Sequence, residues 1–366
     1  MKSKPVTGWW WPPLAGLLVL SAPWPSAFVD VAYSGGVYRW LQSMLTTISN
    51  LTPWTWFDLI VAVAIGLTIR RVVLLVRDAR AGGWLAAGAQ GARRLLRAGG
   101  LALLIFLLFW GLNYRRTPMM TTLSPAGPPA AATVDDLRQL ATDAASLAAR
   151  TRPAARRQLQ SYEDVARSLP LPFDAALKRL GHPPLVVTGR PKYTVFTPFF
   201  TRAGVNGMVD PFALESLVHP DLLPFERPFV LAHEWAHLAG FADEAEASAI
   251  GWSACMGGDE SMVHSAAMYL LVETSAALPR TVWRDVLAAT DAGVQEDLRS
   301  LQTRWQLIQP AVQATSFKVY DEYLKANRVE DGVRSYSRAL QLILLPVLRD
   351  QLNGLRLDPI DPTRLR

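Results

Sequence analysis

The amino-acid sequence predicts an α+β protein that is mainly α-helical, with transmembrane helices near the N-terminus and a small β-sheet in the part that follows. Three observations support this fold class. The first 113 residues contain long apolar runs, and most later segments repeat apolar residues at helical spacing. Between residues 185 and 209, short β-branched and aromatic segments alternate with glycine and proline, which is typical of short strands.

Two or three membrane helices are expected within residues 1–116. The apolar runs 53–75 and 98–113 are candidates, and a weaker run, 12–28, is interrupted by Pro23 and Pro25. A span needs about 17–25 apolar residues, so the run 98–113 is short but acceptable. The weaker run also resembles a signal peptide, but no convincing cleavage site follows it, so we expect an uncleaved anchor. Tryptophans lie at the segment ends, as in an interfacial belt: Trp9, Trp10, Trp11, Trp54, Trp56 and Trp110.

Arginine sets the expected orientation. The segment from Arg70 to Arg97 holds seven arginines and one acid, Asp78, so its net charge is 7 − 1 = +6, the same as the formal charge of the whole chain. Basic loops stay in the cytoplasm, so the part after Asn113 should lie outside. The remaining charges balance, and the basic pI therefore indicates membrane topology and argues against nucleic-acid binding.

The part outside the membrane is expected to consist of a linker, 117–132, and one domain, 133–366. Thr133 should cap a helix, and a further helix is expected near 154–168. Short strands are predicted at 185–188, 193–196 and 205–209, followed by long amphipathic segments at 282–307 and 333–348. The single cysteine, Cys255, excludes an intrachain disulfide and is expected to be a small buried apolar residue.

Residues 233–237 read H-E-x-x-H, and their apolar flanks predict a buried helix. Residues four apart lie on one helical face, so His233 and His237 can bind one Zn²⁺ ion. Glu234 lies beside them and can act as general base toward a zinc-activated water. Two unrelated histidines on a solvated helix would not be expected among such apolar neighbours.

A third ligand is expected from the acidic run after Gly240, which is a plausible helix stop. Asp243 and Glu246 have the spacing of a capping box, which leaves Glu244 free to bind the metal, with Ser248 placed to orient a ligand. Asp243 and Glu246 remain alternatives. Asp243 in particular completes H-E-x-x-H-x-x-G-x-x-D, which mimics the metzincin spacing with aspartate in the last place.

Residues 233–248 resemble the core of an uncharacterised bacterial membrane family, domain of unknown function 3810. Further similar segments are 111–116, 320–327 and 332–336. The resemblance implies a predicted zinc metallopeptidase with membrane helices followed by a zincin-like domain outside the cytoplasm. The spacing also resembles gluzincins, which implies that Glu244 binds zinc and that position 248 supports a ligand. Ser248 departs from the asparagine or aspartate of those proteins.

An oxyanion-stabilising side chain is harder to place. Tyr336 is favoured because it lies in a segment shared with the family, and the other candidates are Tyr320, Tyr323, Arg334 and His264.

We therefore expect a multi-pass zinc metallopeptidase of the bacterial inner membrane, in contact with the lipid bilayer, acting on a peptide or protein substrate, and with catalytic residues Glu234 and Tyr336. One alternative is a catalytically silent, membrane-tethered metal-binding sensor or scaffold. Another is a zinc amidase acting on cell-wall or lipid substrates. Glu234 separates the first alternative from an enzyme, because a structural metal site has no use for a general base.

Overall fold

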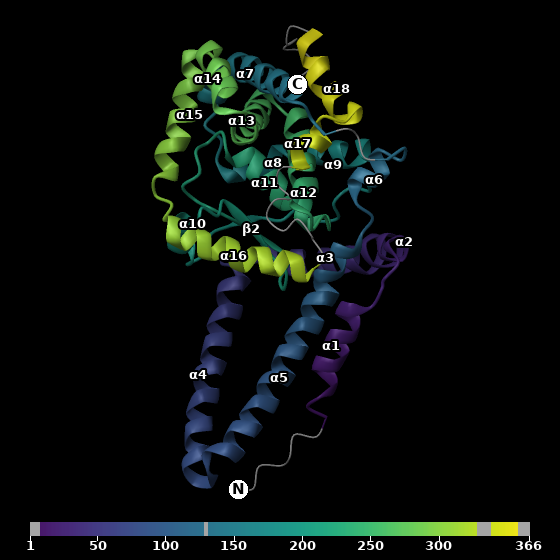
Figure 1. Ribbon diagram of the computed structural model, residues 1–366, viewed down its shortest axis with the longest axis vertical. Helices are drawn as coiled ribbons and strands as arrows, with labels where there is room; N and C mark the ends of the chain where they lie inside the picture. Colours follow the sequence, from purple (N-terminus) through teal and green to yellow (C-terminus); the bar gives the residue numbers. More distant parts are fainter. Residues whose placement is uncertain (1–7, 128–130, 328–337, 358–366) are drawn as a thin grey trace.

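The computed structural model describes residues 8–127, 131–327 and 338–357. This part of the chain is mostly helical and contains one three-stranded sheet. Figure 1 shows long helices projecting from a globular part that holds the sheet. The mainly helical α+β fold class is confirmed.

The projecting part is a helical hairpin of α4 (Trp56–Gly82) and α5 (Trp84–Phe109), reversed at Gly83. The shorter helix α1 (Trp11–Ser21) packs against α5. The predicted basic loop 70–97 is therefore wrong as a loop, because arginine and alanine are good helix formers and both helices continue through it. The predicted span 98–113 corresponds to the second half of α5, next to the globular part, which ends at Phe109 and is followed by the 3₁₀ turn η2 (Gly111–Arg115).

Within the described residues, one helix is long and apolar enough by itself to cross a membrane. This helix is Trp56–Ala81 in α4; its mean hydropathy is 2.4, and none of its most apolar stretch is buried inside the protein. A helix in the core of a soluble protein would be mostly buried, so the exposure of α4 indicates membrane association.

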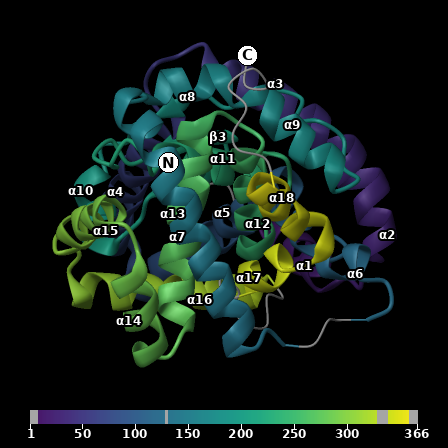
Figure 2. The same cartoon turned by 90° about the horizontal axis from the view of Figure 1, so that it is seen from above.

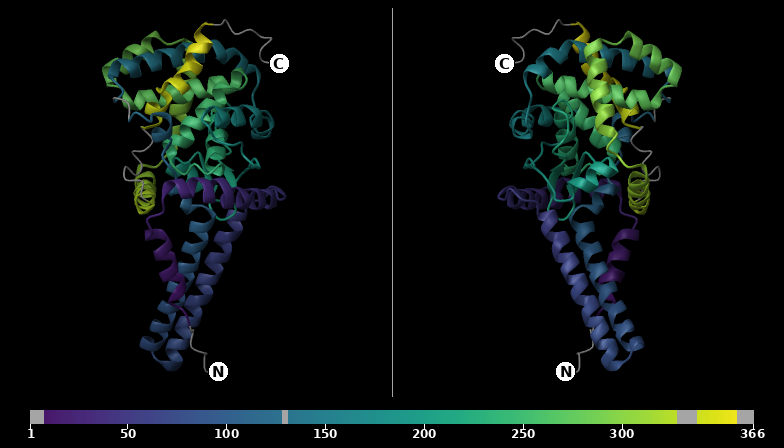
Figure 3. Two further views of the ribbon diagram at one scale, coloured as in Figure 1. Left: turned by 90° about the vertical axis from the view of Figure 1, so that its right-hand side faces the viewer. Right: turned by 90° about the vertical axis from the view of Figure 1, so that its left-hand side faces the viewer.

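The predicted span 12–28 is not one continuous helix. After α1 the chain passes Pro23 and Pro25 and bends by 110° into α2 (Ser26–Phe28), the π-helix η1 (Val29–Val37) and α3 (Tyr38–Asn50). Proline lacks the N–H donor and clashes with the preceding turn, which explains the break. Figure 3 shows α2, η1 and α3 lying across the level at which α4 and α5 leave the globular part.

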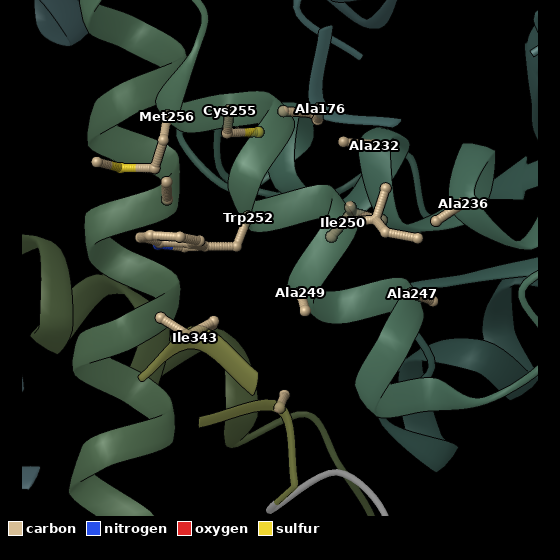
Figure 4. Close-up of a cluster of buried hydrophobic side chains, with 14 of the residues drawn as sticks. Ala176, Ala232, Ala236, Ala247, Ala249, Ile250, Trp252, Cys255, Met256 and Ile343 are labelled. Atoms are coloured by element: carbon tan, nitrogen blue, oxygen red, sulfur yellow. The ribbon is translucent and has the colours of Figure 1, made fainter. Parts of the chain in front are cut away.

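The core of the globular part lies between helices α11 (Arg227–Leu238), α12 (Glu244–Met256) and α13 (Glu260–Ala277). Figure 2 shows α11 and α12 near the centre when the molecule is seen from above. Small side chains on α11 and α12, such as Ala232 and Ala249, allow these helices to pack closely. The fully buried Trp252 points away from α11 toward the side where Ile343 lies, and Cys255 is buried in the same cluster (Figure 4). The surrounding helices are α6 (Met119–Leu123), α7 (Val134–Arg157), α8 (Tyr162–Ser168), α9 (Pro170–Arg179), α10 (Thr197–Ala203), α14 (Arg280–Ala289), α15 (Ala292–Trp305), α16 (Pro310–Ala326), α17 (Arg338–Ile343) and α18 (Pro346–Leu357).

Capping residues decide where several of these helices begin. Thr133 caps α7 in a capping box with Asp136, which confirms its predicted role. The expected helix near 154–168 is broken because Ser161 starts α8 with a second capping box. The segment 282–307 is broken because Asp291 caps α15. In the segment 333–348 the residues before 338 lie outside the described part, and the remainder is divided before Pro346.

The predicted linker 117–132 contains the short helix α6, and its first residue, Met119, is buried against the core. An apolar side chain gains free energy by leaving water, so this end of the segment packs onto the domain instead of spacing it from the membrane.

The sheet has the order β1 (Pro191–Lys192), β3 (Glu215–Val218), β2 (Gly207–Asp210), in which β1 is parallel and β2 antiparallel to the central strand. The predicted strand 205–209 corresponds to β2. The predicted strands 185–188 and 193–196 are wrong, and β3 was not predicted. Residues 185–188 are irregular because α3 supplies their partners: Gln42 donates to the carbonyl of Val187 at 2.6 Å and Asn50 to that of Thr188 at 2.9 Å.

Candidate metal centre

The candidate centre forms where α11 turns into α12. Helix α11 stops at Leu238, and Gly240 has a φ of 87°, a backbone conformation that favours glycine. Asp243 then caps α12 by accepting from the backbone N–H groups of Ala245 and Glu246. This tight turn brings Glu244, the first residue of α12, next to the last turn of α11.

Three side chains meet in this turn. The ligand atoms of His233, His237 and Glu244 all lie within 4.8 Å of one another. Glu244 Oε2 is 3.2 Å from His233 Nε2 and 3.5 Å from His237 Nε2, and the two Nε2 atoms are 3.0 Å apart. The structure therefore brings together the three residues that the sequence predicted as metal ligands.

Each histidine ring is oriented by the partner of its Nδ1 atom, so that its Nε2 atom faces the centre. His237 Nδ1 lies 2.8 Å from the carbonyl oxygen of Phe241, which can only accept, so Nδ1 carries the proton and Nε2 holds a lone pair. His233 Nδ1 lies 3.2 Å from the hydroxyl of Ser248. Two ring nitrogens and a carboxylate oxygen thus converge. Burial lowers the pKa of His237, but the carboxylate of Glu244 outweighs burial and raises it to about 9, so a positive charge is favoured at this point. A cation fits this set of donor atoms, and zinc accepts all of them.

Charge reinforces the same arrangement. Burial raises the pKa of Glu244, but the positive charge of protonated His237 and the hydrogen bonds from both histidines outweigh this effect and hold the pKa well below its ordinary value. Glu244 is therefore a carboxylate, as a metal ligand must be.

The two competing acids point to other partners. Asp243 caps α12 and forms an ion pair with Arg338 at 2.6 Å, so its capping role is confirmed. The predicted capping role of Glu246 is wrong. Its carboxylate accepts instead from the backbone N–H of Met119 at 2.6 Å and thereby tethers α6 to α12.

Glu234, between the two histidines in the sequence, is 3% exposed. Burial raises its pKa to about 8, although nearby His237 lowers it. Among the described residues, its Oε2 has no hydrogen-bond partner. Buried carboxylate oxygens normally have partners, so this orphaned acceptor indicates a group that the protein chain does not supply.

Strand β2 passes directly over Glu234. A Cβ atom placed on Gly207 would lie 2.4 Å from Glu234 Oε1, a separation that real Cβ contacts do not reach. Because β2 is at an edge of the three-stranded sheet, its outer backbone side is available next to the buried carboxylate.

Aromatic side chains surround the centre. Trp110 contacts the His237 ring edge to face at 6.0 Å, and Phe229 packs between His233 and Tyr269. The hydroxyl of Tyr320, on α16, donates to Glu244 Oε1. This hydrogen bond leaves Oε2 directed at the histidines.

The residues predicted as candidates for stabilising an oxyanion lie in different parts of the molecule. Tyr336 and Arg334 lie outside the described residues. Tyr320 reaches the centre, and Tyr323 stacks on it at 5.8 Å. His264 belongs to a separate cluster, 3.4 Å from Asp297 and 3.1 Å from the carbonyl of Ala148. Trp110 was noted in the sequence only as an interfacial residue; its contact with His237 needs the path of the chain and has no local signal.

A comparison with protein families finds one match. The model of a family described as "Protein of unknown function (DUF3810)" matches residues 33–344, which include the hairpin, the H-E-x-x-H helix and α12. No curated protein and no solved structure matches the chain.

Proposed function

The chain belongs to the family of unknown function DUF3810, and from the arrangement of its candidate metal centre we propose that it is a membrane-anchored zinc metallopeptidase of the gluzincin type, with a zincin-like domain outside the cytoplasm. The observation that supports this proposal is the combination of three converging donors with a fourth, buried carboxylate beside them. Each group has a separate task in a hydrolytic reaction.

His233 Nε2, His237 Nε2 and Glu244 Oε2 would hold the ion, with Ser248, the Phe241 carbonyl and Tyr320 keeping these ligands in position. Three protein ligands are the number that catalytic zinc sites use. Zinc, when bound, supplies a Lewis acid that polarises a substrate carbonyl and lowers the pKa of water.

Glu234 would take the proton from the attacking water and deliver it to the leaving nitrogen. Its burial suits this task, because a carboxylate with a pKa raised to about 8 accepts a proton readily near neutral pH. Its unpartnered Oε2 provides an acceptor for that water. Tyr336 stays the proposed oxyanion-stabilising residue from the sequence, and Tyr320 is a second candidate because it already lies at Glu244.

The edge strand β2 supports a peptide as the substrate. An extended peptide can pair with the outer side of an edge strand through backbone hydrogen bonds, which hold a chain irrespective of most side chains. Because β2 runs over Glu234, a peptide bound there would present its carbonyl groups close to the general base.

The membrane region would place this domain outside the cytoplasm of a bacterial cell. In this proposal α4 and α5 both cross the inner membrane, and α1 packs beside them. The arginines lie in the halves of α4 and α5 that are distant from the globular part. Their charge would keep the turn at Gly83 on the cytoplasmic side.

A catalytically silent metal-binding sensor is the main alternative. A structural zinc site is usually closed by four protein ligands, and it gains nothing from a second buried acid that binds no metal. Burying an ionisable group without a partner costs free energy, so the position of Glu234 favours catalysis. A zinc amidase for cell-wall or lipid amides uses the same chemistry and is distinguished only by substrate.

The test uses the full-length protein in lipid nanodiscs. We expect about one zinc per chain by elemental analysis, and its loss in His233→Ala and His237→Ala. Glu234→Gln removes the base but no ligand, so it should keep zinc and stop cleavage of a peptide library read by mass spectrometry. A wild-type protein without zinc, nickel or cobalt would refute the metal site. Zinc with no difference between wild type and Glu234→Gln on peptide, muropeptide and lipid amide libraries would favour the sensor, and cleavage confined to the last two would favour the amidase.

A further inference from the structure

Helix α3 attaches to the globular part through polar side chains on one of its sides. Gln42 donates to the carbonyl of Val187, Thr46 to that of Leu214 at 2.7 Å, and Ser49 to the carboxylate of Glu215 at 2.9 Å. Tyr38 donates to the carbonyl of Leu238 at 3.1 Å. The polar side of α3 is therefore hydrogen-bonded to the globular part.

Another side of α3 is apolar and exposed. Its residues recur every three or four positions and form one stripe along the helix, with exposures from 37% to 78%: Val37, Trp40, Met44, Ile48 and Leu51. We call these five residues the α3 stripe. Large apolar residues exposed singly are ordinary, but a continuous stripe on an otherwise well-anchored helix indicates that something covers it.

The position of the α3 stripe identifies what covers it. Helix α4 begins a few residues after α3. Glu215, which accepts from Ser49 of α3, also holds the start of α4, because the backbone N–H of Phe57 donates to it at 2.7 Å. The most apolar stretch of α4, within Trp56–Ala81, is not buried inside the protein. Figure 3 shows α3 lying across the hairpin at the level where α4 and α5 leave the globular part.

We propose that α3 is an interfacial helix, whose stripe lies in the headgroup–acyl boundary of the bilayer that α4 crosses. The partner is thus a lipid surface, and the proposal rests on the membrane placement in the proposed function. Amphipathic helices at this depth lie in the membrane plane and insert aromatic and aliphatic residues. The exposed Trp40 and Trp54 suit that depth, because tryptophan concentrates at the membrane–water boundary. A second protein copy would not explain why the stripe continues into the apolar surface of α4.

Helix α3 also contacts the helix that carries the candidate metal centre. Tyr38 of α3 holds the carbonyl of Leu238, which is the residue after His237. Trp110, at the end of α5, contacts both Tyr38 at 6.2 Å and His237 at 6.0 Å. The metal centre is therefore linked through Tyr38 and Trp110 to α3 and to the end of α5, the elements that lie at the proposed bilayer surface.

Depth-dependent fluorescence quenching tests the proposal. The one native cysteine, Cys255, is buried, so cysteines introduced at exposed sites can be labelled selectively with the fluorophore NBD. The full-length variants are Trp40→Cys and Ile48→Cys in the stripe, Ile65→Cys in the middle of α4, and Leu171→Cys on the globular part, where the native side chain is 84% exposed. Each is reconstituted into phosphatidylcholine–phosphatidylglycerol vesicles with nitroxide lipids labelled near the headgroup or deep in the chain, and with iodide as the aqueous quencher.

We expect the stripe labels to be quenched several-fold more by the shallow nitroxide than by the deep one, and to be protected from iodide relative to Leu171→Cys. The Ile65→Cys label should respond most to the deep nitroxide. Stripe labels that respond to iodide as strongly as Leu171→Cys would overturn the proposal. Stripe labels shielded from iodide and from both lipids would show a protein partner instead. Loss of lipid quenching at Ile65→Cys would refute the membrane placement itself, whereas failure of the peptidase activity would leave all these readings unchanged.

Discussion

Tyr320 shows how one hydroxyl can set the geometry of the candidate metal centre. It donates to Oε1 of Glu244 and leaves Oε2 for the two histidines. Groups that orient a metal ligand in this way typically contribute about 10–100-fold to metal affinity.

We therefore expect Tyr320→Phe to weaken zinc binding by about 10-fold or more, with little change in melting temperature. The affinity is measured by competition with a chromophoric chelator. Tyr323→Phe is the matched control, because Tyr323 stacks on Tyr320 and its hydroxyl contacts Tyr114 at 3.3 Å. Equal affinities for both variants would show that the hydroxyl on Glu244 has no such role.

Mutation should distinguish the roles of the three neighbouring acids, Asp243, Glu244 and Glu246. Glu244→Ala removes a proposed ligand and should release zinc from a folded protein. Asp243→Ala removes a helix cap, which is worth about 0.5–2 kcal/mol, and Glu246→Ala removes the tether to Met119, a similar loss. Both should lower the melting temperature by a few degrees and keep zinc. Loss of metal in Asp243→Ala alone would indicate that aspartate is the third ligand.

At the residue scale, the sequence was sufficient for side chains whose positions are set within one helix turn or one cap. His233 and His237 follow from helical spacing, and Asp243 follows from the start of α12. Glu246 was misplaced because its partner, the N–H of Met119, lies 127 residues away. The role of Tyr320 was missed for the same reason, since 76 residues separate it from Glu244 and no local pattern links them.

At the scale of elements, the contact between β2 and α11 can be tested directly. In Gly207→Ala the new methyl group would meet Glu234 Oε1 at 2.4 Å, so either the strand or the carboxylate must move. We expect normal zinc content and a loss of hydrolysis of about 10-fold or more, since a displacement of about 1 Å at a reacting group can cost 100-fold. Val209→Ala, farther along the same strand, is the control. Unchanged cleavage by Gly207→Ala would contradict a precise fit of strand and base.

Asp297 links three helices and should make stability depend on pH. This residue of α15 pairs with Arg152 of α7 at 2.8 Å and lies 3.4 Å from His264 of α13. Burial alone would raise its pKa, but the hydrogen bonds from His264 and Arg152 dominate and lower it to about 2. Because the folded-state pKa is below the unfolded value, the stabilisation is complete above the unfolded pKa and is lost as pH falls toward 2.

The measurement compares wild type and Asp297→Asn by thermal unfolding in detergent from pH 6 to pH 2. We expect the wild type to be more stable by about 2 kcal/mol near pH 6, and the difference to shrink as pH falls below about 4. Glu296→Gln is the matched control, because Glu296 also pairs with Arg152 but is largely exposed. A difference that does not change with pH would rule out ionised Asp297 as the source of this stability.

The elements themselves were predictable to different degrees. Helix starts with strong caps, such as that of α7, follow from the sequence, whereas the breaks at Ser161 and Asp291 lay inside longer apolar patterns that favoured continuous helices. The irregular segment 185–188 has the composition of a strand. Its partners are side chains of α3, about 140 residues earlier, and such tertiary hydrogen bonds leave no trace in local periodicity.

At the scale of the whole molecule, the proposed membrane placement makes the hairpin decide which side of the membrane the domain occupies. We expect the turn at Gly83 to be cytoplasmic and the globular part outside. Cysteines introduced at Trp84 and Leu171, exposed by 65% and 84%, test this with a membrane-impermeant thiol reagent on intact cells. Leu171→Cys should react before lysis and Trp84→Cys only after it. The opposite order would invert the topology.

Under the proposed function, the contact between Trp110 and His237 has a consequence for how a substrate reaches the candidate metal centre. In this proposal the candidate metal centre is linked to the elements at the bilayer surface, and it shares a thin layer with every molecule anchored in the same leaflet. Tethered partners search that layer by lateral diffusion, and tethering raises their local concentration to about the millimolar range, as a short flexible linker does. Weak affinity for a free peptide is then compatible with efficient turnover in the membrane. Assays with dilute soluble peptides would therefore give lower rates than assays with peptides anchored in the same membrane.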